Sequence, residues 1–125
     1  MHRKKTKDLQ NNLIETITDA MLDKKAKDPI ILNFTGIPGS ICDAFVICHG
    51  TSRTQVEAIS DHIIGQVKKY SGIHPWHQEG AENAEWILID YSDVVVHVFQ
   101  EERRKFYNLE DLWGDAALTR PKYGS

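Results

Sequence analysis

Apolar positions recur along the chain at two spacings, one typical of helices and one typical of strands. In order, they predict a helix over 8–25, strands over 30–34 and 43–48, a helix between 52 and 72, a strand over 73–79, a hairpin over 86–99 and a last helix over 100–113. This order, α-β-β-α-β-β-β-α, predicts an α/β fold with a mixed five-stranded sheet flanked by helices, since strand–helix–strand connections favour parallel pairing.

The hairpin pattern predicts the most detail. If Ser92 and Asp93 form a two-residue turn, the strand register is fixed. The cross-strand pairs are then Tyr91–Val94, Ile89–Val96 and Ile87–Val98 on one face, and Trp86–Phe99, Leu88–His97 and Asp90–Val95 on the other. The first face is almost wholly apolar and must belong to the core. The second face combines large aromatic rings with a carboxylate and an imidazole. It is therefore either covered by a helix or another subunit, or it is the functional surface.

The last helix carries aromatic residues on two of its sides. Phe106, Leu109 and Trp113 share one side at i, i+3 and i+7 and should pack inward. Tyr107 is on the adjacent flank, together with Arg103, Arg104, Glu110 and Asp111. A tyrosine among charges, next to a Trp-bearing sheet, resembles a protein-binding hot spot in composition. The alternative is that Tyr107 only covers the edge of the core.

The charge of the chain is small overall but unevenly distributed. The 125 residues, 41% hydrophobic and 26% charged, suffice for one domain with a single core. The net charge is −3, yet residues 72–117 carry ten acids against three cations, a balance of −7, and residues 1–27 carry seven cations against four acids. An acidic half attracts basic partners and repels phosphate backbones, which disfavours direct binding of DNA or RNA through it.

Cysteine use and hydropathy favour a cytoplasmic protein. Cys42 and Cys48 lie on one expected strand, so about 20 Å separates their Cα atoms and they cannot bridge each other. Two buried, reduced thiols fit the cytosol; whether either has a redox role stays open. No apolar run approaches the ~20 residues of a membrane span. The basic start, residues 1–7, leads into no apolar signal core and is expected to be flexible.

Several segments resemble the Iojap/ribosomal silencing factor family. They are Asp43-Ala-Phe-Val-Ile-Cys-His-Gly-Thr-Ser52, Glu79-Gly80 ahead of Trp86-Ile-Leu-Ile-Asp90, Asp93-Val-Val-Val-His-Val-Phe99, and Arg104-Lys-Phe-Tyr-Asn-Leu-Glu-Asp-Leu-Trp113. The resemblance covers residues 9–116, and the last two segments together are highly specific. We therefore expect a domain over residues 8–117, followed by a flexible tail over 118–125.

The resemblance implies a nucleotidyltransferase-like α/β fold, a homodimer, and a translation repressor rather than an enzyme, with no cofactor. It implies binding to ribosomal large-subunit protein fourteen, a basic protein, which blocks joining of the small subunit. In such proteins a hairpin Trp and a last-helix Tyr face the ribosomal protein; here these are Trp86 and Tyr107. The expected partner-binding residues are Trp86, Tyr107, Glu79, Asp90, His97, Glu110, Asp111 and Trp113.

An alternative is a nucleotidyltransferase-like, nucleotide-binding enzyme. Gly50-Thr-Ser52 lies at a strand-to-helix turn, where backbone N–H groups can bind phosphate. Such enzymes also need an Asp-x-Asp pair on the following strand to bind metal ions, and that strand offers Glu79 alone. Helix capping by Thr51 or Ser52 explains the turn more simply.

Two further interpretations are weaker. His74 and His77, with His49 or His97, could bind a metal, although no Cys-x-x-Cys accompanies them. His97 and Asp90 resemble a catalytic pair, but a structural hydrogen bond or an interface role is simpler. The chain could also be a dimerisation module with no ribosomal target.

Overall fold

The computed structural model describes the backbone of residues 2–121 and the side chains of residues 10–121. Its elements are α1 (His2–Asp23), β1 (Lys27–Asn33), β2 (Ala44–Gly50), α2 (Arg53–Ser71), β3 (His77–Glu79), β4 (Trp86–Asp90), β5 (Val94–Gln100), α3 (Glu101–Tyr107), α4 (Leu109–Leu112) and β6 (Ala117–Thr119). The predicted mixed α/β class is confirmed, but the sheet has six strands rather than five.

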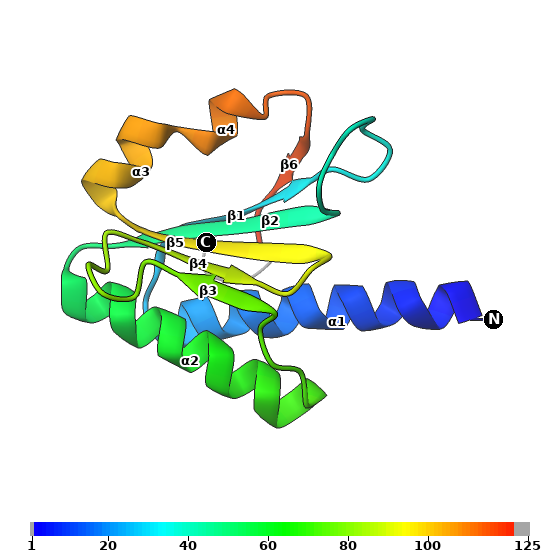
Figure 1. The fold of residues 1–125 in the computed structure, drawn as a ribbon, viewed down its shortest axis with the longest axis horizontal. Helices are drawn as coiled ribbons and strands as arrows, with labels where there is room; N and C mark the ends of the chain where they lie inside the picture. Colours follow the sequence, from blue (N-terminus) through cyan, green and yellow to red (C-terminus); the bar gives the residue numbers. More distant parts are fainter. Residues whose placement is uncertain (1, 122–125) are drawn as a thin grey trace.

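The strands form one mixed sheet in the order β3-β4-β5-β2-β1-β6. The central neighbours β2 and β5 are parallel, and the other neighbouring pairs of the described sheet are antiparallel. Helix α2 carries the chain back across the sheet, which lets β5 run parallel to β2. The long helices α1 and α2 cover one face, and the short helices α3 and α4 lie over the other (Figure 1).

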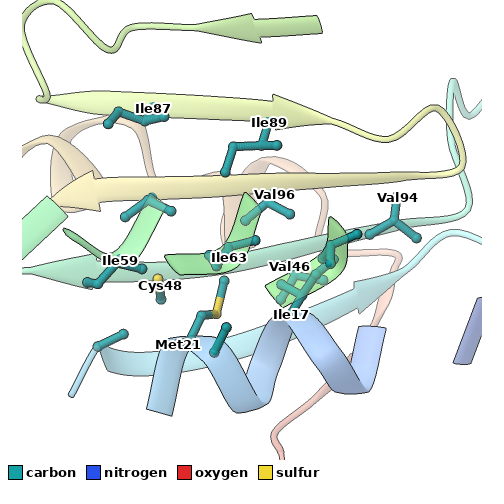
Figure 2. Packing of buried hydrophobic residues seen from close by; sticks show 14 of the residues in the cluster. Ile17, Met21, Val46, Cys48, Ile59, Ile63, Ile87, Ile89, Val94 and Val96 are labelled. Atoms are coloured by element: carbon teal, nitrogen blue, oxygen red, sulfur yellow. The ribbon is translucent and has the colours of Figure 1, made fainter. Parts of the chain in front are cut away.

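The main core fills the space between the sheet and helices α1 and α2. Ile17 and Met21 of α1, with Ile59 and Ile63 of α2, pack against side chains of β2, β4 and β5 (Figure 2). All four helix side chains are fully buried, and burying each contributes about 1.5–3 kcal/mol. Strands β2 and β5 are buried on both faces, which explains their near-continuous apolar sequences. This core fixes the β4–β5 hairpin in place.

The hairpin has the predicted register. The described pairs are Trp86–Phe99, Ile87–Val98, Leu88–His97, Ile89–Val96 and Asp90–Val95. The Tyr91 N–H donates to the Val94 carbonyl at 2.9 Å, which confirms the two-residue turn. Within that turn Ser92 has a φ of 77°, and its N–H donates to the Asp90 carboxylate at 2.7 Å. The face with the aromatic rings therefore lies away from α1 and α2.

The last predicted helix is broken in two at Asn108. This residue has a left-handed backbone, with φ of 47°, and it ends α3 and begins α4. A left-handed residue interrupts the helical period, so the side chains before and after it no longer share one stripe. Leu109 is buried as predicted. Phe106 is 76% exposed, so the prediction that it packs inward is wrong, and Arg104 is buried instead.

Both ends of the chain differ from the predicted boundaries. Helix α1 begins at His2 rather than at residue 8, and the side chains of the predicted flexible segment 1–7 lie outside the described residues. Strand β6 pairs with β1 and extends the sheet past residue 117, into the predicted tail; residues 122–125 are outside the description. Within residues 2–121, no helix combines the length and apolar character that crossing a membrane requires.

Candidate protein-docking surface

Trp86 and Tyr107 lie side by side on the face of the sheet opposite α1 and α2. Their ring centroids are 4.6 Å apart, although one residue is on β4 and the other is on α3. The Trp86 indole also stacks on Phe99 of β5 at 4.9 Å. Tyr107 is 42% exposed, and the adjacent ring of Phe106 meets it edge-on at 5.2 Å. We call these three residues, Trp86, Phe106 and Tyr107, the aromatic patch.

Helix α3 reaches this position because it follows β5 without a loop. Gln100 ends β5, and its backbone N–H donates to the Glu85 carbonyl at 2.8 Å. Its side-chain amide donates to the Ala84 carbonyl at 2.9 Å. Both acceptors lie just before β4, so the start of α3 is attached beside Trp86. Two helical turns later the phenol of Tyr107 meets the indole.

His97 forms a hydrogen bond with the Trp86 indole. The indole Nε1–H donates to His97 Nδ1 at 3.0 Å. Because an indole N–H can only donate, Nδ1 must be unprotonated, and the neutral ring then carries its proton on Nε2. His97 is 3% exposed, and burial lowers its pKa to about 4, which keeps it neutral near pH 7. A partner cannot reach this side chain, so any contribution to docking runs through Trp86.

Glu79 of β3 and Asp90 of β4 lie on the same face of the sheet as Trp86, at the β3–β4 edge. Glu79 is paired with Leu88 across the strands, and Leu88 is two residues from Trp86 on the same face. The exposed carboxylate of Glu79 lies 3.0 Å from Nε2 of His77. Asp90, partly buried, accepts the bond from the hairpin turn. These two carboxylates place negative charge on the face of the β3–β4 edge that also carries Trp86.

The other three predicted residues lie on α4 and just after it. Trp113 packs edge-on against Phe34 at 5.2 Å and so attaches α4 to the sheet. Glu110 is mostly buried and accepts a bond from Arg104 at 3.3 Å. Asp111 is exposed and accepts a bond from the Asn108 side chain at 2.6 Å. Of the three, Asp111 is the one whose charge faces solvent.

Arg104 is a site residue that the sequence pattern does not indicate. The helical pattern predicts it on a charged flank of the last helix, whereas its side chain is buried against β1, β2 and α4. The acceptors include the backbone carbonyls of Lys27 and Asp28, which precede Arg104 by 77 and 76 residues. No spacing rule in the sequence indicates such a contact.

The turn after β2 is a helix cap. Ser52 Oγ accepts the Gln55 N–H at 3.1 Å, as the capping interpretation predicts. The Gln55 side chain folds back over the turn, and its Oε1 accepts the Thr51 N–H at 2.8 Å. Two N–H groups that a phosphate would need are therefore already bonded within the protein. This geometry does not support nucleotide binding at the turn.

The other candidate chemistries find little geometric support. His97 binds Trp86 through Nδ1 rather than pairing with Asp90. In the part of the chain that the structure describes, no three His, Cys, Asp or Glu side chains converge on a common metal position. Cys42 and Cys48 are free and buried, as predicted, but Cys42 precedes β2 rather than lying on the same strand as Cys48. Burial raises their pKa values to about 11 and about 12, so both thiols are protonated and weakly nucleophilic near pH 7.

One protein family matches almost the whole chain: residues 6–123 fit the family described as "Ribosomal silencing factor during starvation", RsfS. A Halalkalibacterium halodurans protein named ribosomal silencing factor RsfS is 49% identical over 104 residues, 83% of this chain and 87% of that protein. The protein of that name from Bacillus subtilis is 43% identical over 115 residues, 92% of this chain and 96% of that protein. A crystal structure from Bacillus halodurans, 41% identical, has a TM-score of 0.77 and covers 89% of this chain and 99% of that one.

Proposed function

Because the chain belongs to the ribosomal silencing factor (RsfS) family, as its motifs predict, we propose that it binds the large ribosomal subunit and represses translation. The partner that the resemblance implies is ribosomal large-subunit protein fourteen. Once bound, the domain occupies space that the small subunit needs, so the two subunits cannot join. The observation that carries this proposal is the contact between the Trp86 and Tyr107 rings at an exposed surface.

The aromatic patch is the centre of the proposed contact. Aromatic side chains bury large apolar areas with few rotatable bonds, which is why they dominate binding hot spots. The Trp86 ring is held on three sides, by His97, Phe99 and Tyr107. Since the ring is ordered before binding, less conformational entropy is lost when a partner covers it.

The carboxylates around the patch serve to attract a basic partner. Glu79 and Asp90 lie on the sheet side, and Asp111 lies on the α4 side. Such charges raise the association rate at low salt more than they raise affinity. Glu110 and Trp113 act indirectly in this proposal, because their contacts hold α4 against the sheet.

The proposed action is steric, in the cytoplasm, and involves no catalysis. The resemblance also implies a homodimer, and we include it in the proposal. Analytical ultracentrifugation over a range of protein concentrations tests this point, and a monomer at all of them would remove it. Incubation with nucleoside triphosphates and Mg²⁺ tests the absence of catalysis; turnover that Asp90→Ala abolishes would contradict it.

Co-sedimentation with purified large subunits tests the docking site. Trp86→Ala and Tyr107→Glu should each weaken retention by about 30-fold or more, the size of a hot-spot loss. The chain offers matched controls of the same residue types, because Trp76 and Tyr70 are both highly exposed and lie outside the aromatic patch. Trp76→Ala and Tyr70→Glu should sediment like the wild type. Circular dichroism verifies that all four variants fold.

Two outcomes of the co-sedimentation experiment would contradict the proposal. If the two patch variants remain bound to large subunits as well as the two controls do, the docking site lies elsewhere. If the wild type itself is not retained, ribosome binding is wrong and the dimerisation module becomes the better interpretation.

A further inference from the structure

Arg104 is a buried cation at the centre of a set of contacts beneath α3. Its side chain is 6% exposed. Nη1 donates to the carbonyl of Asp28 at 2.8 Å and to Nδ1 of His49 at 2.9 Å, and lies 3.4 Å from the Lys27 carbonyl. Nη2 lies 3.3 Å from Glu110 Oε2 and 3.5 Å from Asp28 Oδ2. One guanidinium thus joins β1, the end of β2, and α4.

The backbone acceptors lie at an irregularity of the sheet. The pairing of β1 with β2 shifts register between Lys27 and Ile30, and Asp28 there has a φ of 44°. A β-bulge of this kind disrupts the ladder locally and can leave carbonyl groups without strand partners. Arg104 supplies donors to two of these carbonyls. Its planar fork suits several acceptors at once, which a lysine ammonium on a flexible stem cannot reproduce.

Helices α3 and α4 need such an attachment. They contain seven and four residues, and isolated helices of this length are unstable in water. Their buried residues are Arg104 and Leu109, with Trp113 packing beyond them on the sheet. Tyr107 is three residues after Arg104, which places the phenol less than one helical turn from the buried guanidinium.

We propose that Arg104 is the positioning residue of the docking surface: it fixes α3 on the sheet and thereby holds Tyr107 against Trp86. A partner cannot touch this buried side chain, so its effect on binding is transmitted through the aromatic patch. The proposal rests on the proposed function only for the claim that the patch binds the ribosome. The attachment of α3 is a property of the free protein and is measured without a partner.

Arg104→Met and Arg103→Met form a matched pair on the same helix. Arg103 is exposed and pairs with Glu85 at 3.0 Å. In Arg104→Met, backbone amides of α3 and α4 should exchange with deuterium about tenfold faster or more, while those of α1, α2 and the central strands keep their protection. Nuclear Overhauser contacts between the rings of Trp86 and Tyr107 should weaken. Arg103→Met should leave both readouts at wild-type values.

Two further variants keep the proposal testable if Arg104→Met does not fold. Arg104→Lys retains the charge but not the fork, so exchange in α3 should lie between wild type and Arg104→Met. Glu110→Ala removes only the α4 partner and should accelerate exchange there. Wild-type exchange and an intact ring contact in the folded variants would overturn the proposal.

Binding is then measured with large subunits. Arg104→Lys should weaken retention about tenfold, because α3 must be ordered during binding. Loss of ring contact with full retention would overturn the positioning role while leaving the attachment itself supported. If the wild type is not retained, the proposed function fails, and the exchange and ring-contact data still decide whether Arg104 attaches α3.

Discussion

Lowering the pH from 7 to 5 should destabilise the fold through one buried imidazole, that of His97. Its Nδ1 accepts the bond from Trp86, and burial lowers its pKa from the ordinary 6.5 to about 4. In the unfolded chain the ring regains its ordinary pKa. Between pH 6.5 and 4 the unfolded protein therefore binds a proton that the folded protein does not. The free energy of unfolding consequently decreases as the pH is lowered through this window. Above this window neither state is protonated, and below it the loss is complete.

The size of the effect follows from the two pKa values. A difference of about 2.5 units corresponds to about 3 kcal/mol once the loss is complete. At pH 5 the linkage relation gives a loss of about 2 kcal/mol. The free energy of unfolding of a single domain is about 5–15 kcal/mol, so this is a measurable share.

Urea unfolding followed by circular dichroism, repeated from pH 7 to pH 4.5, measures the effect in wild type and in His97→Gln. The glutamine oxygen can still accept the indole bond but takes up no proton. Other histidines and carboxylates titrate in both proteins, so the difference between the two curves isolates His97. The wild type should lose about 2 kcal/mol more than the variant between pH 7 and 5. Parallel curves would refute the argument that this ring is buried and neutral.

Three further outcomes are expected. Gly80→Ala should lower the free energy of unfolding in urea by about 2 kcal/mol or more. Gly80 has a φ of 86°, and a Cβ there would lie 1.9 Å from the Trp86 carbonyl oxygen. An unchanged free energy of unfolding would contradict this close approach. Ser52→Ala should cost about 1 kcal/mol in the same assay through loss of the α2 cap, and Ser71→Ala, at an exposed position at the other end of the same helix, gives the comparison. Cys42 and Cys48 should react slowly with Ellman's reagent in the folded protein and quickly in urea, since both thiols are buried and protonated; fast native reaction would show that they are accessible.

The elements with strong local periodicity were predictable from the sequence. The hairpin register follows from alternating apolar positions around a two-residue turn, and the structure has those pairs. The two long helices follow from apolar residues at spacings of three and four. The contact between Trp86 and Tyr107 agrees with the motif-based expectation that both face one partner. That they bind a partner stays a prediction.

What the sequence did not reveal depends on contacts between distant segments. Asn108 adopts a left-handed backbone in the middle of an apparently continuous helical stripe, and before it Phe106 is exposed whereas Arg104 is buried. From sequence, a charged residue is expected to face solvent. The carbonyl acceptors that make burial of Arg104 favourable belong to β1, far earlier in the chain. The sequence does not indicate strand β6, because its three residues are all exposed and carry no alternating pattern.

The short strand β6 has a practical consequence for anyone shortening this chain. It pairs with β1 along Ile31–Asn33 and occupies the outer edge of the sheet there. Truncation or a bulky fusion within residues 117–119 would uncover a row of backbone hydrogen-bonding groups, a template on which strands of other molecules can assemble. Oligomers of such shortened forms would report this uncovered edge, so the native assembly state should be measured on the full chain.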